Sequence, residues 1–191
     1  MRCLLLLLFL SLLGLAGPGC QTTERVTELT IEQEVTIDFE AVLADVAEEV
    51  IVPFDDMRTE SRYVDLRPLL VCVGLDVEKT QIVITSLEGI EALPLDFSIA
   101  LSRPDQNNWI PLATFSGNVA SGTVVRFADA DVTIDTQGEE FLLVTALSNE
   151  PVYDVRIEGV PGADASALVV DFHLELRFSS QLGGCEPQIL R

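Results

Sequence analysis

Residues 168–178 read LVVDFHLELRF, a stretch in which apolar and polar side chains alternate. The even-numbered positions are leucine, valine or phenylalanine, whereas the odd-numbered positions from 171 to 177 are aspartate, histidine, glutamate and arginine. Successive side chains of a strand point to opposite faces, so this pattern predicts a strand with one dry face and one wet face. Such strands are typical of antiparallel sheets that pack one face against a partner layer.

The same period of two residues recurs along the chain. We predict strands at residues 29–39, 82–87, 95–101, 109–115, 123–127, 153–157 and 168–178. Short segments rich in polar or small residues, at 103–108, 116–122 and 161–165, separate consecutive strands, and we expect each to join neighbouring antiparallel strands.

Three segments depart from this period. Residues 39–50 and 139–147 place apolar side chains at helical spacing, which predicts a helix or helical turn in each, with a strand as the alternative. Residues 61–70 predict irregular structure that ends at Arg67-Pro68. Together the elements predict an all-β fold, a two-sheet antiparallel β-sandwich of jelly-roll or immunoglobulin-like type with one or two short helices.

The first twenty residues have the composition of an export signal. Met1-Arg2 precedes a leucine-rich run at 4–13, and small residues continue to Gly19. The run is shorter than the roughly 20 residues that span a bilayer and has the length of a signal-peptide core. We therefore expect a signal peptide at 1–19, a tether at 20–26 and a single domain at 27–191.

The small residues that lead to Cys20 resemble the lipobox of bacterial lipoproteins. This resemblance implies cleavage before Cys20 and acylation of its sulfur and new amino terminus, which would tether the protein to a membrane. In Gram-negative lipoproteins an aspartate after the cysteine favours retention in the inner membrane, so Gln21 implies the outer membrane. We therefore expect an exported protein that its lipid anchors to a membrane, at the outer membrane, the cell surface or the periplasm. The alternatives are plain secretion after cleavage at Ala16 or Gly19, and a retained anchor helix.

Four cysteines stand at positions 3, 20, 72 and 185. Removal of the signal and lipidation of Cys20 would leave Cys72 and Cys185, which predicts one disulfide in an oxidising compartment. The alternative is that Cys72, inside the apolar run 69–75, is a buried free thiol.

The chain is acidic, with 31 aspartates and glutamates against 11 lysines and arginines and a formal net charge of −20. Such a surface repels nucleic acid, so we expect no nucleic-acid partner. The sequence has no glycine-rich phosphate loop, and we expect no cofactor. The expected partners are the membrane, through the N-terminal lipid, and an envelope protein or a glycan.

His173 is the one histidine and would share a strand face with Asp171 and Glu175, each about 7 Å away. A histidine–carboxylate pair can act in acid–base catalysis, but no nucleophile motif such as GxSxG accompanies it, so we expect a solvated histidine rather than a catalytic residue. The single histidine and the absence of a CxxC spacing also argue against a zinc site.

Two further candidate sites follow from residue type. Asp129, Asp131, Asp135 and Glu140 could form a loose calcium site, although not an EF-hand, because isoleucine stands where that loop needs glycine. Trp109 is a candidate sugar contact, with packing at the start of a strand as the alternative.

These observations predict a lipid-anchored cell-envelope or surface protein with a non-enzymatic structural or interaction role. The alternative is a carbohydrate- or calcium-assisted ligand-binding module, and a third hypothesis is a secreted hydrolase. An interaction protein should expose an apolar patch. A sugar-binding module should expose Trp109 in a groove, and a hydrolase should have a deep pocket with converging carboxylates or His173.

Overall fold

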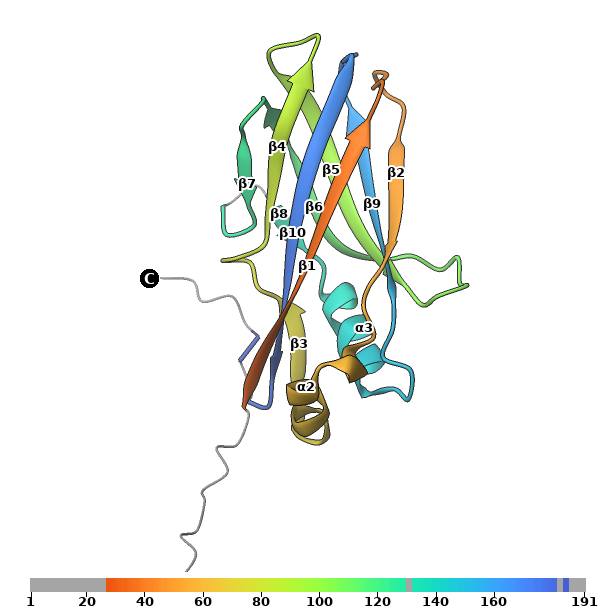
Figure 1. The fold of residues 1–191 in the computed structure, drawn as a ribbon, viewed down its shortest axis with the longest axis vertical. Coiled ribbons are helices and arrows are strands. Elements are labelled where there is room, and N and C mark those ends of the chain that lie inside the picture. Colours follow the sequence, from red (N-terminus) through yellow and green to blue (C-terminus); the bar gives the residue numbers. More distant parts are fainter. Residues whose placement is uncertain (1–26, 130–131, 182–183, 186–191) are drawn as a thin grey trace, which may run out of the picture.

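Two antiparallel sheets packed face to face make up most of the computed structural model, which describes residues 27–129, 132–181 and 184–185 (Figure 1). The first sheet contains β1 (Glu28–Phe39), β3 (Cys72–Leu75), β4 (Gln81–Glu88), β7 (Val124–Arg126) and β10 (Ala167–Ser179). The second contains β2 (Glu48–Pro53), β5 (Leu93–Ser102), β6 (Ile110–Val119), β8 (Val132–Ile134) and β9 (Asp154–Pro161). The predicted β-sandwich is confirmed.

Strand β10 organises the first sheet. It pairs along its whole length with β1 on one side, and on the other side first with β4 and then with β3. Its even-numbered side chains from Leu168 to Phe178 are buried, as the alternation predicts, and the ring of Phe178 packs edge to face on that of Tyr63. The ring of Phe172 meets that of Phe97 in β5 edge to face, with the ring centroids 5.4 Å apart. This contact joins the two sheets through the centre of the core.

The second sheet has the strand order β2-β9-β5-β6-β8. The loop at 103–108 joins β5 and β6, which are neighbours, as predicted. The prediction for residues 116–122 and 161–165 is wrong, because these segments carry the chain from the second sheet to the first, into β7 and β10. The two sheets pack with their apolar faces together, so a strand of one sheet can be followed by a strand of the other. These short connections therefore cross between the sheets and do not close hairpins.

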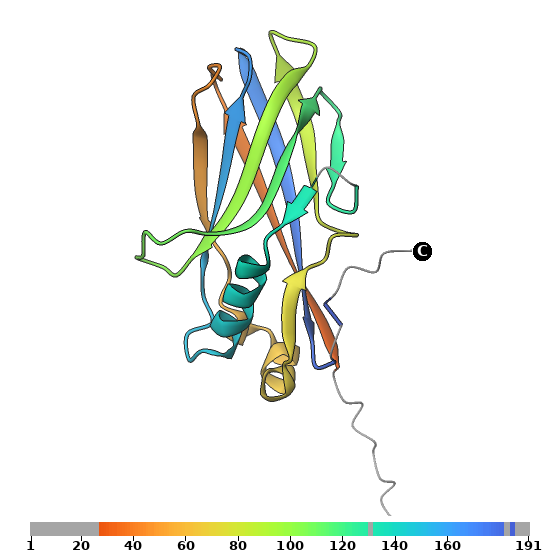
Figure 2. The same cartoon turned by 180° about the vertical axis from the view of Figure 1, so that it is seen from behind.

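The short helices lie together at one end of the sandwich (Figures 1 and 2). Helix α3 (Thr136–Leu147) confirms the helical interpretation of 139–147, and it begins where the Asp135 carboxylate accepts a hydrogen bond of 2.8 Å from the Gln137 amide. No helix among the described residues has the length and apolar character needed to cross a membrane.

Two predictions about helical segments are wrong. Residues 39–50 do not form a helix: Val42 makes an isolated bridge to Ala165, and β2 follows from Glu48. Residues 61–70 are not irregular, because α2 (Ser61–Leu66) and a 3₁₀ turn η2 (Arg67–Leu69) occupy them, after a 3₁₀ turn η1 (Met57–Thr59). Burial of Tyr63 and Leu66 stabilises this short helix beyond its intrinsic propensity.

Replacing Phe172 by alanine should lower the free energy of unfolding by about 3–5 kcal/mol, because it removes a buried ring and leaves a cavity between the sheets. Urea denaturation followed by circular dichroism measures this change. The control is Thr114→Ala on the exposed face of β6, which should change stability by no more than about 0.5 kcal/mol. A similar small effect for both variants would contradict the described packing.

Candidate functional site

The outer face of β10 carries Asp171, His173, Glu175 and Arg177, as the sequence predicts. The antiparallel register with β1 places Glu34 opposite His173 and Glu32 opposite Glu175. Because Glu32 and Glu34 have the same strand parity, their exposed side chains lie on this outer face as well. The two strands therefore concentrate charged groups on one side of the first sheet.

Glu175 is the unexpected member of this face, because its side chain is only 1% exposed. The turn 76–80, which joins β3 to β4, lies beside it along β10. The Asp76 amide donates a hydrogen bond of 2.8 Å to the Glu175 carbonyl oxygen, and the Glu175 amide donates one of 3.1 Å to the Thr80 hydroxyl. Alternation of polar residues alone predicts a solvated Glu175, so the sequence analysis missed its burial.

Two ion pairs hold the buried carboxylates. Glu175 Oε1 lies 2.6 Å from Lys79 Nζ, and Asp76 Oδ2 lies 2.6 Å from Arg177 Nη2. The hydrogen bond to Glu175 raises the pKa of Lys79, a group that is largely exposed. A buried carboxylate without a partner is strongly unfavourable, so these cations compensate the loss of water. Lys79 is also the only lysine of the sequence.

His173 lies between carboxylates. Its Nδ1 atom is 3.3 Å from Glu34 Oε1, and its Nε2 atom is 3.9 Å from Glu175 Oε2. Oε2 is buried and accepts no hydrogen bond from the described residues. One ligand atom each from Glu32, His173 and Glu175 lies within 4.8 Å of the other two, and no other set of three metal-ligating residues in the described parts of the chain does so. We define these three residues as the β10 cluster.

Asp171 lies on the outer face of β10, as its sequence position predicts, and its carboxylate contacts both neighbouring strands. Its carboxylate accepts hydrogen bonds of 2.6 Å from the hydroxyls of Thr36 and Thr85, on the two flanking strands. These two hydrogen bonds lower the pKa of Asp171. The three residues share this face, but their contacts differ: His173 lies near Glu34 and Glu175, whereas Asp171 accepts hydrogen bonds from β1 and β4.

The candidate calcium ligands are placed as follows. Asp129 lies in the turn after β7, where its amide donates a hydrogen bond to the Arg126 carbonyl oxygen. Asp135 caps α3, and Glu140 lies exposed on that helix. Asp131 lies outside the described residues. The carboxylate of Asp135 already has a structural role as a helix cap.

Trp109 precedes β6 and is half-buried. The guanidinium carbon of Arg156 lies 5.0 Å from the centre of its ring, which is the geometry of a cation–π contact.

A separate groove of about 460 Å³ crosses the outer face of the second sheet. Its lining includes the polar residues Asp96, Ser98, Thr114, Ser116, Thr133 and Glu158, and it does not include Trp109.

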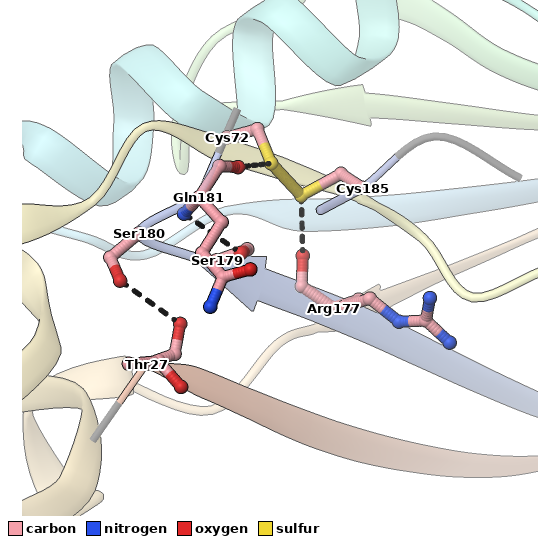
Figure 3. Close-up of a disulfide and its surroundings, with 7 residues drawn as sticks. All are labelled: Thr27, Cys72, Arg177, Ser179, Ser180, Gln181 and Cys185. Atoms are coloured by element: carbon pink, nitrogen blue, oxygen red, sulfur yellow. Dashed lines mark hydrogen bonds between the residues drawn. A yellow bond between two sulfur atoms is a disulfide. The ribbon is translucent and has the colours of Figure 1, made fainter. Parts of the chain in front are cut away.

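Cys72 and Cys185 form the predicted disulfide, with their Cα atoms 6.1 Å apart (Figure 3). The bond connects the start of β3 to the segment that follows β10. Beside it, the Ser180 amide donates a hydrogen bond of 3.0 Å to the Thr27 carbonyl oxygen, just before β1. The disulfide therefore lies at the end of the first sheet where β1 begins and β10 ends.

Comparison with known proteins adds no functional assignment. No family model matches the chain, and no curated protein matches it.

Replacing both Cys72 and Cys185 by serine should lower the free energy of unfolding by about 4–5 kcal/mol, because the bond closes a loop with a sequence separation of 113 residues. Denaturation with and without reductant measures the effect. The double variant should be insensitive to reductant, whereas the natural chain should lose stability on reduction. Equal stability of the natural chain in both conditions would contradict this role of the disulfide.

Replacing Thr36 and Thr85 together by valine should raise the pKa of Asp171, because both donors to its carboxylate are lost. Titration of the carboxylate by NMR measures this shift. With a lowered pKa, Asp171 stabilises the fold fully above the unfolded-state value and loses this contribution as the pH falls below about 4. The control Thr30→Val, on the same face of β1, should leave the pKa of Asp171 unchanged. A double variant with an unshifted pKa would contradict the role of these hydrogen bonds.

Proposed function

We propose that the protein is exported, anchored to a membrane through a lipid on Cys20, and acts as a non-enzymatic interaction or structural module of the cell envelope. The composition of residues 1–20 supports export and acylation. The disulfide between Cys72 and Cys185 supports the same compartment, because such bonds persist in oxidising environments.

The observation that carries this proposal is the set of elements found at the end of the sandwich where the described chain begins. Thr27 lies beside the disulfide, and Arg62 of α2 donates a hydrogen bond of 3.2 Å to the Glu28 carbonyl oxygen. Helices α2 and α3 lie at the same end (Figure 2). A tether of residues 20–26 would reach at most about 25 Å, so this end would face the membrane.

Exposed apolar side chains occur on the elements at this end. They are Val64 in α2, Leu69 in η2, Val71 after it, and Val144 and Leu147 in α3. The elements are joined directly, since the Tyr63 hydroxyl donates to the Ala146 carbonyl oxygen and Arg67 donates to that of Leu147. Five of the nine exposed large apolar side chains among the described residues lie on these elements, and such a concentration favours a contact surface over a solvated one.

A second candidate function is the binding of a polar ligand such as a glycan on the second sheet. The groove of about 460 Å³ supports it, because its carboxylate and hydroxyl groups can form hydrogen bonds with sugar hydroxyls. Chemical-shift changes of Ser98 and Thr114 during titration with an oligosaccharide would distinguish this function from the first.

Expression of the whole chain in a Gram-negative host should yield a mature protein that begins at an acylated Cys20 and sediments with membranes. Two lipid signals hold a protein firmly at a bilayer, so Cys20→Ser should abolish acylation and stable membrane anchoring. Mass spectrometry of the N-terminal peptide measures both modification and cleavage site. The control is Cys3→Ser, which should leave anchoring unchanged. A mature chain that begins elsewhere, or carries an unmodified Cys20, would overturn the proposed anchor.

A further inference from the structure

We propose that Glu32, His173 and Glu175, the β10 cluster, bind a divalent transition-metal ion of the zinc class. One imidazole nitrogen and two carboxylates converge on the outer face of the first sheet, within 4.8 Å of one another. This site is independent of the proposed anchor at Cys20, since it lies along the strands β1 and β10.

The donor set favours zinc over calcium. Zinc binds imidazole nitrogen and carboxylate oxygen at about 2.0–2.2 Å, usually with four ligands. Calcium instead requires six to eight oxygen ligands, which one histidine and two glutamates do not provide. Three protein ligands would leave one position on zinc for water or for an atom of another molecule.

Glu175 supplies the strongest indication of a missing ligand. Its side chain is 1% exposed, and Lys79 occupies only Oε1. Oε2 is buried without a hydrogen-bond donor from the described residues, an arrangement that is unfavourable unless another group satisfies the oxygen. The 3.9 Å between Oε2 and His173 Nε2 is longer than a hydrogen bond and close to the roughly 3.3 Å between two ligands of one tetrahedral zinc ion.

The surroundings of His173 orient it as a metal ligand. Its Nδ1 atom lies 3.3 Å from Glu34 Oε1, and its Nε2 atom is the ring nitrogen on the side of Glu175 Oε2. Coordination of a metal ion through Nε2 would place the Glu34 carboxylate beside the other ring nitrogen. A carboxylate behind a metal-binding histidine fixes the tautomer and orientation of the ring in this way.

The local charge also favours a cation. Glu32, Glu34 and Glu175 bring three carboxylates to the neighbourhood of His173, and Lys79 is the opposing cation paired with Glu175. The register between β1 and β10 places both glutamates of β1 directly opposite His173 and Glu175. A bound ion would therefore join the two strands through their side chains as well as through their backbone.

Because the chain has one histidine, its imidazole nitrogen signals report on this site alone. We expect titration of the purified, chelator-treated protein with zinc chloride to shift the nitrogen signals of His173 saturably at one ion per chain. The melting temperature should rise with the same concentration dependence. Titration with calcium chloride should leave the nitrogen signals unchanged at the same concentrations.

Variants assign the ligands, with calorimetry measuring zinc affinity. His173→Gln and Glu32→Gln should each weaken zinc binding more than about 100-fold, and Glu34→Gln about tenfold, as expected for a positioning residue. Because Glu32 is exposed, Glu32→Gln tests the site without disturbing the buried Glu175 or its ion pair with Lys79. The matched control is Asp38→Asn, which removes one charge from the same face of β1 about 13 Å from His173 and about 20 Å from Glu32, and it should leave affinity within about twofold.

Two results would overturn the proposal. One is the absence of a saturable shift of the His173 nitrogen signals at millimolar zinc. The other is equal zinc affinity of the natural chain and a His173→Gln variant whose circular dichroism shows that it remains folded. A calcium affinity equal to that for zinc would overturn the assignment of the metal class.

Discussion

The burial of one face of β10 against the second sheet is the constraint on which the rest of the structure depends. Val170, Leu176 and Phe178 are excluded from water, and Phe172 meets Phe97 of the opposite sheet. Strand β10 also pairs with strands on both of its edges, so its position sets theirs. Once the even-numbered residues face the core, the period of two residues directs Asp171, His173, Glu175 and Arg177 to the other side.

The charged groups of that outer face lie around the break between β3 and β4, which both pair with the same edge of β10. β10 is flanked by β3 and then by β4, and the turn 76–80 between them covers part of a face that would otherwise be solvated. Asp76 of this turn and Glu175 beside it are buried. Arg177 neutralises Asp76, and Lys79 neutralises Glu175. In a chain with a net charge of −20, the only lysine thus stabilises a buried carboxylate. The oxygen of Glu175 that has no hydrogen-bond partner among the described residues lies beside the only histidine, and this distinguishes the region from an ordinary solvated strand face.

The region that supports a membrane anchor and the region that supports metal binding lie in different parts of the fold. The start of β1, β3 and the helices α2 and α3 lie at the end from which a tether would leave (Figure 1), and the disulfide begins at Cys72 of β3. The β10 cluster lies along the strands that rise from this end, on the outer face of the first sheet. An anchored module of this form would hold one end near the membrane and present the charged face to the surrounding compartment.

The sequence by itself determined the strand character of 29–39 and 168–178, and it favoured a helix within 139–147 over a strand and the pairing of Cys72 with Cys185 over a free thiol. Each of these depends on a local period or on a count of the available cysteines. Only the tertiary structure decided that 116–122 and 161–165 cross between sheets, that α2 forms, and that Glu175 is buried. Packing between segments far apart in the chain overrides local preference at these places. Glu32 and Glu175 meet because β1 pairs with β10 in one particular register, and a period of two residues indicates which face a side chain takes but not which strand lies beside it.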